Sequence, residues 1–361
     1  MNDQLKKPNI FKALAKVKKM LETEHRFNVW GIFLQGSQNY NLDIYEEGYT
    51  SDIDMKAFII PTFDELYSGK KKSDLYTTEF GQVEVKDIRL FHELLKNANP
   101  AAIELLFTDY KIVKSHSFIF NLANAIVEEK KFLIYKAMSK TVFNKLKTLF
   151  TVGNARKEEF ERCGYDPKEL HHILRGRNFL ERFTEHNNYK KAMFYDEKAL
   201  DDSITREWLI DFKVAKEPLP ADVVKAYAEQ AVAAADYLAE LHPISKYPIT
   251  DTALDFVYDV IKDIIKAQML VETKHKSKEA FQYHSHFGQL TKEQRMYLEN
   301  LGLGINKEHF VDLLEYREYE LVNFWPIEYK RPEPEATLDA QEFEKERNRD
   351  SETSELLSPL D

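Results

Sequence analysis

The chain contains 361 residues, of which 43% are hydrophobic and 31% charged, and it carries a formal net charge of −10 at pH 7. Its single cysteine excludes an internal disulfide framework and a cysteine-rich zinc module, and no apolar run approaches the roughly 18 residues that a membrane span needs. We therefore expect a cytoplasmic protein with no membrane partner, built from two domains plus appendages.

The acidic net charge does not exclude a nucleic-acid partner, because the charge is unevenly distributed. Residues 331–361 contain ten acidic and four basic side chains, so about six of the net negative charges fall in this segment. The rest of the chain is nearly balanced, which leaves room for a local basic groove. Residues 328–361 are also poor in apolar side chains, a composition that predicts a disordered acidic tail.

The N-terminal part begins with a helix and a strand that lead into a glycine-serine turn. Apolar residues at helical spacing predict an amphipathic helix over residues 8–25, and an apolar, partly β-branched run predicts a strand over residues 29–34. The sequence Gln-Gly-Ser-Gln-Asn-Tyr-Asn-Leu follows, with the turn at Gly36 and Ser37. Glycine lets the backbone approach a phosphate closely, and the serine hydroxyl can hydrogen-bond phosphate oxygens.

A second strand is predicted over residues 51–60, ended by Pro61. Side chains alternate across a strand, so Asp52 and Asp54 are expected to project from one face, about 7 Å apart. Two carboxylates so placed can share a divalent cation. The preceding loop over residues 43–50 either covers a nucleotide or is a surface loop.

A third carboxylate would complete an oxygen-rich site for Mg²⁺. Residues 82–86 alternate apolar and polar side chains, which predicts a half-buried strand with Glu84 on its polar face. Asp87 is expected to point the other way or to open the next helix, so we favour Glu84 over Asp87. The other elements predicted here are a short helix over residues 63–69, a hairpin strand over residues 75–80 and a helix over residues 87–97.

These residue types in this order predict a nucleotidyl-transfer site. Carboxylates hold Mg²⁺ while leaving positions for triphosphate oxygens and an attacking hydroxyl, and two such ions clamp the two oxygens of an in-line displacement. Asp52 and Asp54 would bind both ions, with Mn²⁺ as a substitute, and Glu84 would bind the ion that activates the hydroxyl. Gly36 and Ser37 would hold the triphosphate. A lone Asp-x-Asp is more often a solvated strand edge, and only the ordered combination is specific.

A second, α-helical domain follows. Asn99 and Pro100 are residue types of a helix cap and first helical position, and the apolar run after them contains Glu104, which we interpret as structural, with the alternative that it reaches the site. From about residue 115 the pattern is mainly helical. The predicted helices cover residues 116–128, 131–151, 167–184, 205–213, 221–241 and 252–268.

One stretch of this second domain, Gly-Tyr-Asp-Pro-Lys-Glu-Leu-His-His-Ile-Leu-Arg, carries chemistry. Lys168, His172 and Arg175 recur at spacings of four and three from a helix start, which places them on one stripe, whereas His171 lies off it. A cationic stripe at a helix N-terminus can bind a triphosphate or an RNA backbone. The competing interpretation is a solvated polar helix face.

At these residues the chain resembles the DNA polymerase beta superfamily of nucleotidyltransferases, and most closely its bacterial and phage RNA repair pathway group. The group's Gly-Ser-x-x-Tyr-Gly-Leu motif matches residues 36–42, with Asn41 in place of glycine, a mild departure because asparagine tolerates left-handed backbone. Its Asn-Pro and Glu-Leu motif matches residues 99–105, and its Gly-Tyr-Asp-x-Lys, His, Arg motif matches residues 164–175. The resemblance implies nucleotide binding by Tyr40, Lys168, His172 and Arg175, and it fades beyond about residue 265.

We therefore expect an α/β (α+β) catalytic domain with a mixed sheet at residues 1–111 and a helical domain at residues 112–270 that closes a nucleotide cleft. The expected reaction moves a nucleoside monophosphate from a nucleoside triphosphate to a hydroxyl, with RNA, such as a tRNA 3′ end, favoured as acceptor because the resembled group is associated with RNA repair. One alternative acceptor is a protein or a second nucleotide. The other alternative is a catalytically silent nucleotide-binding protein.

The C-terminal part is less informative. Residues 271–327 are expected to form a small helical unit, with helices over residues 291–302 and 307–324. Three histidines between residues 275 and 286 lack the spacing and the nearby carboxylates of a metal site, so we expect none there. The oligomeric state, the base of the nucleotide and the number of nucleotides added stay open.

Overall fold

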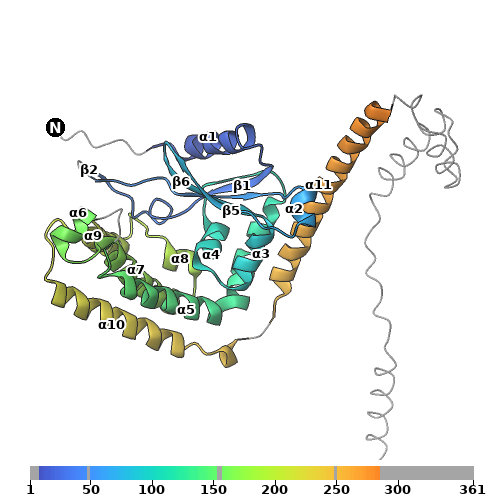
Figure 1. The fold of residues 1–361 in the computed structure, drawn as a ribbon. Helices are drawn as coiled ribbons and strands as arrows, with labels where there is room; N and C mark the ends of the chain where they lie inside the picture. The colour runs from blue at the N-terminus through green and yellow to red at the C-terminus, as the bar shows by residue number, and fades with distance from the viewer. Residues whose placement is uncertain (1–7, 47–48, 153–156, 248–249, 285–361) are drawn as a thin grey trace, which may run out of the picture. The chain divides into compact units, whose positions relative to one another are not determined.

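A five-stranded mixed sheet forms the N-terminal part of the fold (Figure 1), in the order β5–β6–β4–β1–β7. Strands β4 and β6 run parallel, and the other neighbouring pairs run antiparallel. The strands are β1 (Val29–Leu34), β4 (Met55–Ile59), β5 (Ser73–Thr78), β6 (Gly81–Asp87) and β7 (Lys111–Val113). The mixed sheet predicted from the sequence is confirmed, and β1 has the predicted bounds.

This computed structural model describes residues 8–46, 49–152, 157–247 and 250–284, and the side chains of these residues up to residue 272. The described residues up to residue 279 group as one compact unit. The predicted helices over residues 291–302 and 307–324 and the predicted tail lie outside the described residues. The predicted division at residue 111 stays a prediction.

Each face of the sheet is covered by helices, because β1 and β4 carry large apolar side chains on both faces. Helix α1 (Ile10–Thr23) lies over one face, where its Leu14 belongs to the same apolar cluster as Ile32 (Figure 1). Helices α3 (Arg89–Lys96) and α4 (Pro100–Phe107) lie on the other face, where Trp30 and Phe33 are buried. A bulge near Gly31 shifts the pairing of β1 with β4.

The apolar cluster of this second face continues without a break into the helical part of the unit. Helices α5, α7 and α10 pack against one another, and α9 packs on α7. These helices and their neighbours are α5 (Ala123–Thr148), α6 (Lys157–Cys163), α7 (Pro167–His186), α8 (Tyr189–Met193), α9 (Leu200–Val214), α10 (Ala221–Glu240) and α11 (Thr252–His284). Short elements complete the description: α2 (Phe63–Tyr67), the 3₁₀ turns η1 (Ser117–Leu122) and η3 (Ile244–Lys246), and the ribbon of β2 (Tyr45–Glu46) and β3 (Tyr49–Thr50).

Several predicted helix boundaries were wrong: α9 begins at Leu200 rather than at residue 205, and α11 continues past residue 268. The predicted helices over residues 116–128 and 131–151 are one 3₁₀ turn followed by the single helix α5, because neither proline nor glycine interrupts the chain between them. Asn99 precedes α4 but makes no capping hydrogen bond through its side chain. Asp166 does cap α7, accepting from the backbone N–H groups of Lys168 and Glu169 at 2.9 and 3.2 Å.

No helix among the described residues is long and apolar enough to span a membrane.

Candidate active site

The Gly-Ser turn that follows β1 needs two left-handed residues. Gly36 has a φ of +81° and Asn41 a φ of +64°, so asparagine adopts here the conformation that the motif's glycine would. The turn is closed by hydrogen bonds from Asn39 N–H to the Gly36 carbonyl (3.0 Å) and from Leu42 N–H to the Ser37 carbonyl (2.8 Å). A Cβ on Gly36 would lie 3.3 Å from an Asp54 carboxylate oxygen, so the turn lies directly against this carboxylate.

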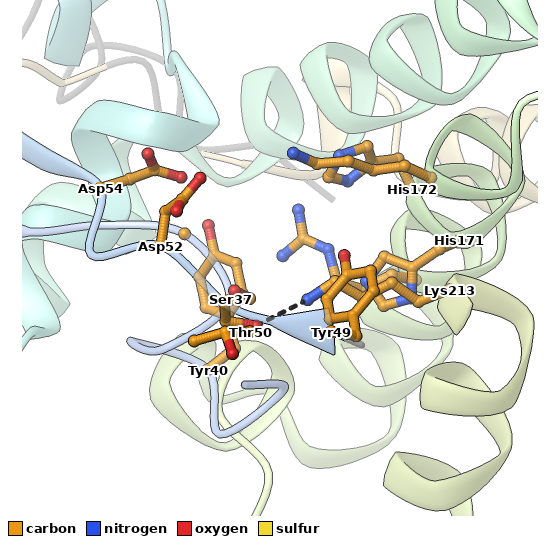
Figure 2. A pocket seen from close by; sticks show the side chains of 13 residues that line it. Ser37, Tyr40, Tyr49, Thr50, Asp52, Asp54, His171, His172 and Lys213 are labelled. Atoms are coloured by element: carbon orange, nitrogen blue, oxygen red, sulfur yellow. Dashed lines mark hydrogen bonds between the residues drawn. The ribbon is translucent and has the colours of Figure 1, made fainter. Parts of the chain in front are cut away.

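Asp52 and Asp54 lie just before β4 rather than within it, as the longer predicted strand had placed them. Their backbone is still held in the sheet, because the Asp54 carbonyl accepts from Gln35 N–H (3.0 Å) and Ile53 N–H donates to the Phe80 carbonyl (2.8 Å). Figure 2 shows the two carboxylates side by side, facing the same pocket. Burial raises the pKa of Asp54, as does the neighbouring charge of Asp52, while Lys168 and Lys213 act in the opposite direction.

These carboxylates form one side of a pocket with a volume of about 210 Å³. Basic side chains from α7 and α9 form the other side, as Figure 2 shows for His172 and Lys213. The pocket is lined by Gly36, Ser37, Tyr40, Tyr49, Thr50, Ser51, Asp52, Asp54, Lys168, His171, His172, Arg175 and Lys213. The structure thus gathers in one cavity the predicted residues of the Gly-Ser turn, the Asp-x-Asp pair and the α7 stripe.

The loop before Asp52 also contributes to the pocket. Tyr49 and Thr50 of strand β3, together with Ser51, line it. The sequence left two interpretations of this loop open, a cover for a nucleotide or a surface loop. In this structure the end of the loop is part of the pocket wall.

Two histidines of α7, His171 and His172, line the pocket, and both have a pKa below the ordinary value of a histidine. His171 donates its Nδ1–H to the Leu209 carbonyl at 2.9 Å, and burial together with Lys213 lowers its pKa to about 3. Burial also lowers the pKa of His172 well below its ordinary value, and the neighbouring His171 and Arg175 add to this shift. The positive charge of this wall therefore comes from Lys168, Arg175 and Lys213, and the imidazoles can offer only neutral hydrogen-bonding groups.

Lys213 is the pocket residue that the sequence analysis missed most clearly. It belongs to α9, and its ammonium group donates to the Leu42 carbonyl (3.1 Å) and the Ser51 hydroxyl (3.4 Å), on the two ends of the loop between the Gly-Ser turn and Asp52. Burial, and next the charge of Lys168, lowers the pKa of Lys213 to about 8. A solitary lysine in a predicted helix gives no signal in the sequence.

Tyr40, predicted to bind nucleotide, serves other partners in this structure. Its hydroxyl donates to the carboxylate of Glu104, and the guanidinium carbon of Arg175 lies 4.3 Å from the centre of its ring. Burial, followed by the charge of Glu104, raises the pKa of Tyr40 above its ordinary value. Tyr40 therefore lines the pocket, but its hydroxyl donates to Glu104 rather than into the pocket.

Glu84 departs from its expected place beside the aspartates. Parallel pairing of β4 with β6 sets Glu84 opposite Lys56, and its two carboxylate oxygens accept from Lys56 (2.9 Å) and Lys86 (2.7 Å). It does not line the pocket. Asp87 is no substitute, because its carboxylate is buried against Arg89. Among the described side chains, no group of three histidine, cysteine, aspartate or glutamate residues is placed to hold a metal ion.

We predict that Glu84→Gln acts on stability rather than on a metal. Lys56 is 3% exposed, so removing its counter-charge should lower the free energy of unfolding by about 2 kcal/mol, less than for a fully buried pair. Burial alone would raise the pKa of Glu84, but its hydrogen bonds to Lys86 and Lys56 lower it overall. The deficit of the variant should therefore be full at pH 7 and shrink as the pH falls below about 4.3. Urea titrations at pH 7 and pH 3.5 measure it, and an equal deficit at both would contradict the prediction.

The donor set fits a divalent cation only in part. Asp52 and Asp54 supply hard carboxylate oxygens on one side of the pocket, and a cation there would offset their mutual repulsion. Glu84, the predicted third ligand, instead forms ion pairs with Lys56 and Lys86. Asp52 and Asp54 are therefore the residues that would hold a cation, and the geometry gives no support to a three-carboxylate site.

Comparison with known proteins adds little. No protein-family model and no curated protein matches the chain. The chain is similar to the crystal structure of a nucleotidyltransferase-like protein from Exiguobacterium sibiricum 255-15, with 13% sequence identity over 79% of this chain and 96% of that one. The TM-score of this match is 0.23, so the likeness carries no argument about function. A functional assignment therefore rests on the motif resemblance and on the geometry of the pocket.

Proposed function

We propose that this protein is a Mg²⁺-dependent nucleotidyltransferase that transfers a nucleoside monophosphate from a nucleoside triphosphate to a hydroxyl group. One observation carries the proposal: two carboxylates face Lys168, Arg175 and Lys213 across a single pocket. A pocket with carboxylates alone suits a cation, and one with cations alone suits an anion. A site with both sets is suited to a metal-bound polyphosphate.

Each part of the pocket has a role in this proposal. Asp52 and Asp54 hold the cation, which supplies charge neutralisation for the triphosphate. Ser37 and the cationic side chains of Lys168, Arg175 and Lys213 bind phosphate oxygens, and neutral His172 offers them a ring N–H. Gly36 allows the turn to pass close to Asp54. In the reaction the oxygen of the acceptor hydroxyl bonds to the α-phosphorus, the bond from that phosphorus to pyrophosphate breaks, and the hydroxyl proton passes to water.

RNA is the acceptor we favour, and this choice rests on the motif resemblance alone. A protein side chain or a second nucleotide offers the same hydroxyl chemistry and is the main alternative. The catalytically silent alternative is disfavoured because Asp52 and Asp54 are both present and both face the pocket.

The test is to incubate the full chain with each α-labelled nucleoside triphosphate, Mg²⁺ and either total RNA or whole lysate, and then to follow pyrophosphate and the label. We expect metal-dependent pyrophosphate release with label in RNA. Label in protein or in a soluble dinucleotide would keep the transferase and replace the acceptor. The proposal would be overturned if no triphosphate released pyrophosphate, either with total RNA or with whole lysate.

A further inference from the structure

Glu104 is a buried carboxylate in an otherwise apolar helix. Residues 102–107 of α4 are all buried, and Glu104 is only 2% exposed. Burial raises its pKa, whereas its hydrogen bond from Tyr40 and the charge of Arg175 act in the opposite direction. A carboxylate is costly to bury unless hydrogen bonds and charges compensate it. Its partners therefore indicate what the glutamate contributes.

Both carboxylate oxygens bind the Gly-Ser turn. One accepts the backbone N–H of Gly36 at 3.3 Å, and the other accepts the hydroxyl of Tyr40. These two residues begin and end the segment that contains Ser37, so Glu104 fixes both ends of the stretch facing the pocket. The turn is thereby anchored to α4 through a single side chain.

The same carboxylate acts on the basic wall through Tyr40. The guanidinium of Arg175 stacks on the Tyr40 ring at 4.3 Å, a distance typical of a cation–π contact. Arg175 belongs to α7, whereas the turn follows β1. The chain of contacts from Gly36 through Glu104 and Tyr40 to Arg175 therefore connects the turn beside the carboxylates with a cation of the opposite wall.

We propose that Glu104 is a positioning residue, which holds the Gly-Ser turn and Arg175 at the spacing that a bound polyphosphate requires. The inference rests on the proposed function for the identity of the ligand. It also revises the predicted role of Gly36, because the Gly36 N–H is occupied by Glu104 and does not point at a phosphate. Phosphate contacts at the turn then fall to Ser37, and Gly36 contributes its left-handed conformation.

The first test reads the turn directly by hydrogen exchange at the Gly36 amide. Glu104→Met removes both acceptor oxygens and keeps an unbranched buried side chain, and Glu104→Gln keeps one acceptor without charge. Amide exchange at Gly36 should accelerate on the order of ten- to a hundredfold in the methionine variant and less in the glutamine variant. The matched control is Asp87→Asn, which removes another buried carboxylate of the same part of the fold, 2% exposed and paired with Arg89.

The second test measures binding of inorganic tripolyphosphate with Mg²⁺ by calorimetry, at a temperature where every variant is folded. We expect affinity to fall at least tenfold in Glu104→Met, to recover partly in Glu104→Gln and to stay unchanged in Asp87→Asn. Tyr40→Phe keeps the aromatic ring under Arg175 and removes the tyrosine hydroxyl. Its affinity for tripolyphosphate should lie between that of Glu104→Met and that of Asp87→Asn. Tyr40→Phe decides between the outcomes if Glu104→Met does not fold.

The outcomes separate the inference from the proposed function. If the wild-type chain does not bind tripolyphosphate, the proposed function fails, while exchange at Gly36 still reports whether Glu104 holds the turn. If the wild type binds, and the Glu104 and Tyr40 variants match Asp87→Asn in both exchange and affinity, Glu104 is only a core residue and the positioning role is overturned.

Discussion

Asp54→Asn is expected to lower Mg²⁺-dependent nucleotide transfer at least about a thousandfold while leaving the melting temperature unchanged or higher. The loss follows because a metal-held phosphate contributes several kcal/mol of charge stabilisation, and each 1.4 kcal/mol is about tenfold in rate. Asp52→Asn should act in the same direction, since both carboxylates face the pocket. Pyrophosphate release with and without Mg²⁺ measures the effect.

The stability half of this prediction follows from the direction of the pKa shift. Burial and Asp52 raise the pKa of Asp54 in the folded protein, so ionisation of Asp54 disfavours the fold at neutral pH. The asparagine variant should therefore exceed the wild type in stability most clearly at pH 7, and this difference in stability should vanish as the pH falls below about 3.9.

A matched control is Asp87→Asn, which breaks a buried ion pair with Arg89. That variant should lose stability and keep its turnover, the reverse of the Asp54 result. Full activity of Asp54→Asn would remove Asp54 from the site, and a large drop in its melting temperature would show that its charge is structural.

The sequence was most informative where a local pattern is sufficient. Strand β1 was predicted with its observed bounds because an apolar run buried on both faces is bounded by a glycine turn. The start of α7 at residue 167 was predicted, because an Asp-Pro pair suits the N-cap and the first position of a helix. The stripe of α7 followed from helical spacing alone, and all three of its members line the pocket.

The sequence was least informative where packing between distant elements decides. Alternation along β6 predicted correctly that Glu84 shares a face with Lys86, but it carried no information about which residue of β4 lies opposite. Pairing placed Lys56 there instead of Asp54. Lys213 reaches the pocket because α9 packs on α7 and the Lys213 ammonium group donates to the Leu42 carbonyl. No local sequence pattern predicts a contact between residues so far apart in the chain.

Lys213→Met is expected to weaken tripolyphosphate binding by about one to two decades and, at the same time, to stabilise the folded protein at pH 7. A charge-assisted contact to phosphate is worth on the order of 1.5–3 kcal/mol, which gives the loss of affinity. The gain in stability follows from burial of the ammonium group. Burial and the charge of Lys168 lower its pKa to about 8, against about 10.4 for an exposed lysine.

The sign of the pH dependence makes this prediction specific. Between pH 8 and about 10.4 the folded wild type binds fewer protons at Lys213 than the unfolded chain does, so wild-type stability should rise with pH over this window. The methionine variant lacks that rise. At pH 7 the variant should exceed the wild type in free energy of unfolding by about 1–3 kcal/mol, reduced by the loss of two hydrogen bonds. This difference should shrink as the pH approaches about 10.4.

Lys216→Met is the matched control for Lys213→Met, because Lys216 follows α9 and pairs with Glu46 of β2 through an exposed ion pair outside the pocket. It should change neither ligand affinity nor stability appreciably. Calorimetric titration of tripolyphosphate at pH 7 and pH 9 adds a further check, because wild-type affinity should fall as Lys213 loses its charge, while that of Lys213→Met should change less. Unchanged affinity in Lys213→Met would show that the lysine takes no part in binding phosphate. A lower melting temperature at pH 7 would show that its hydrogen bonds to the loop outweigh the cost of burying its charge.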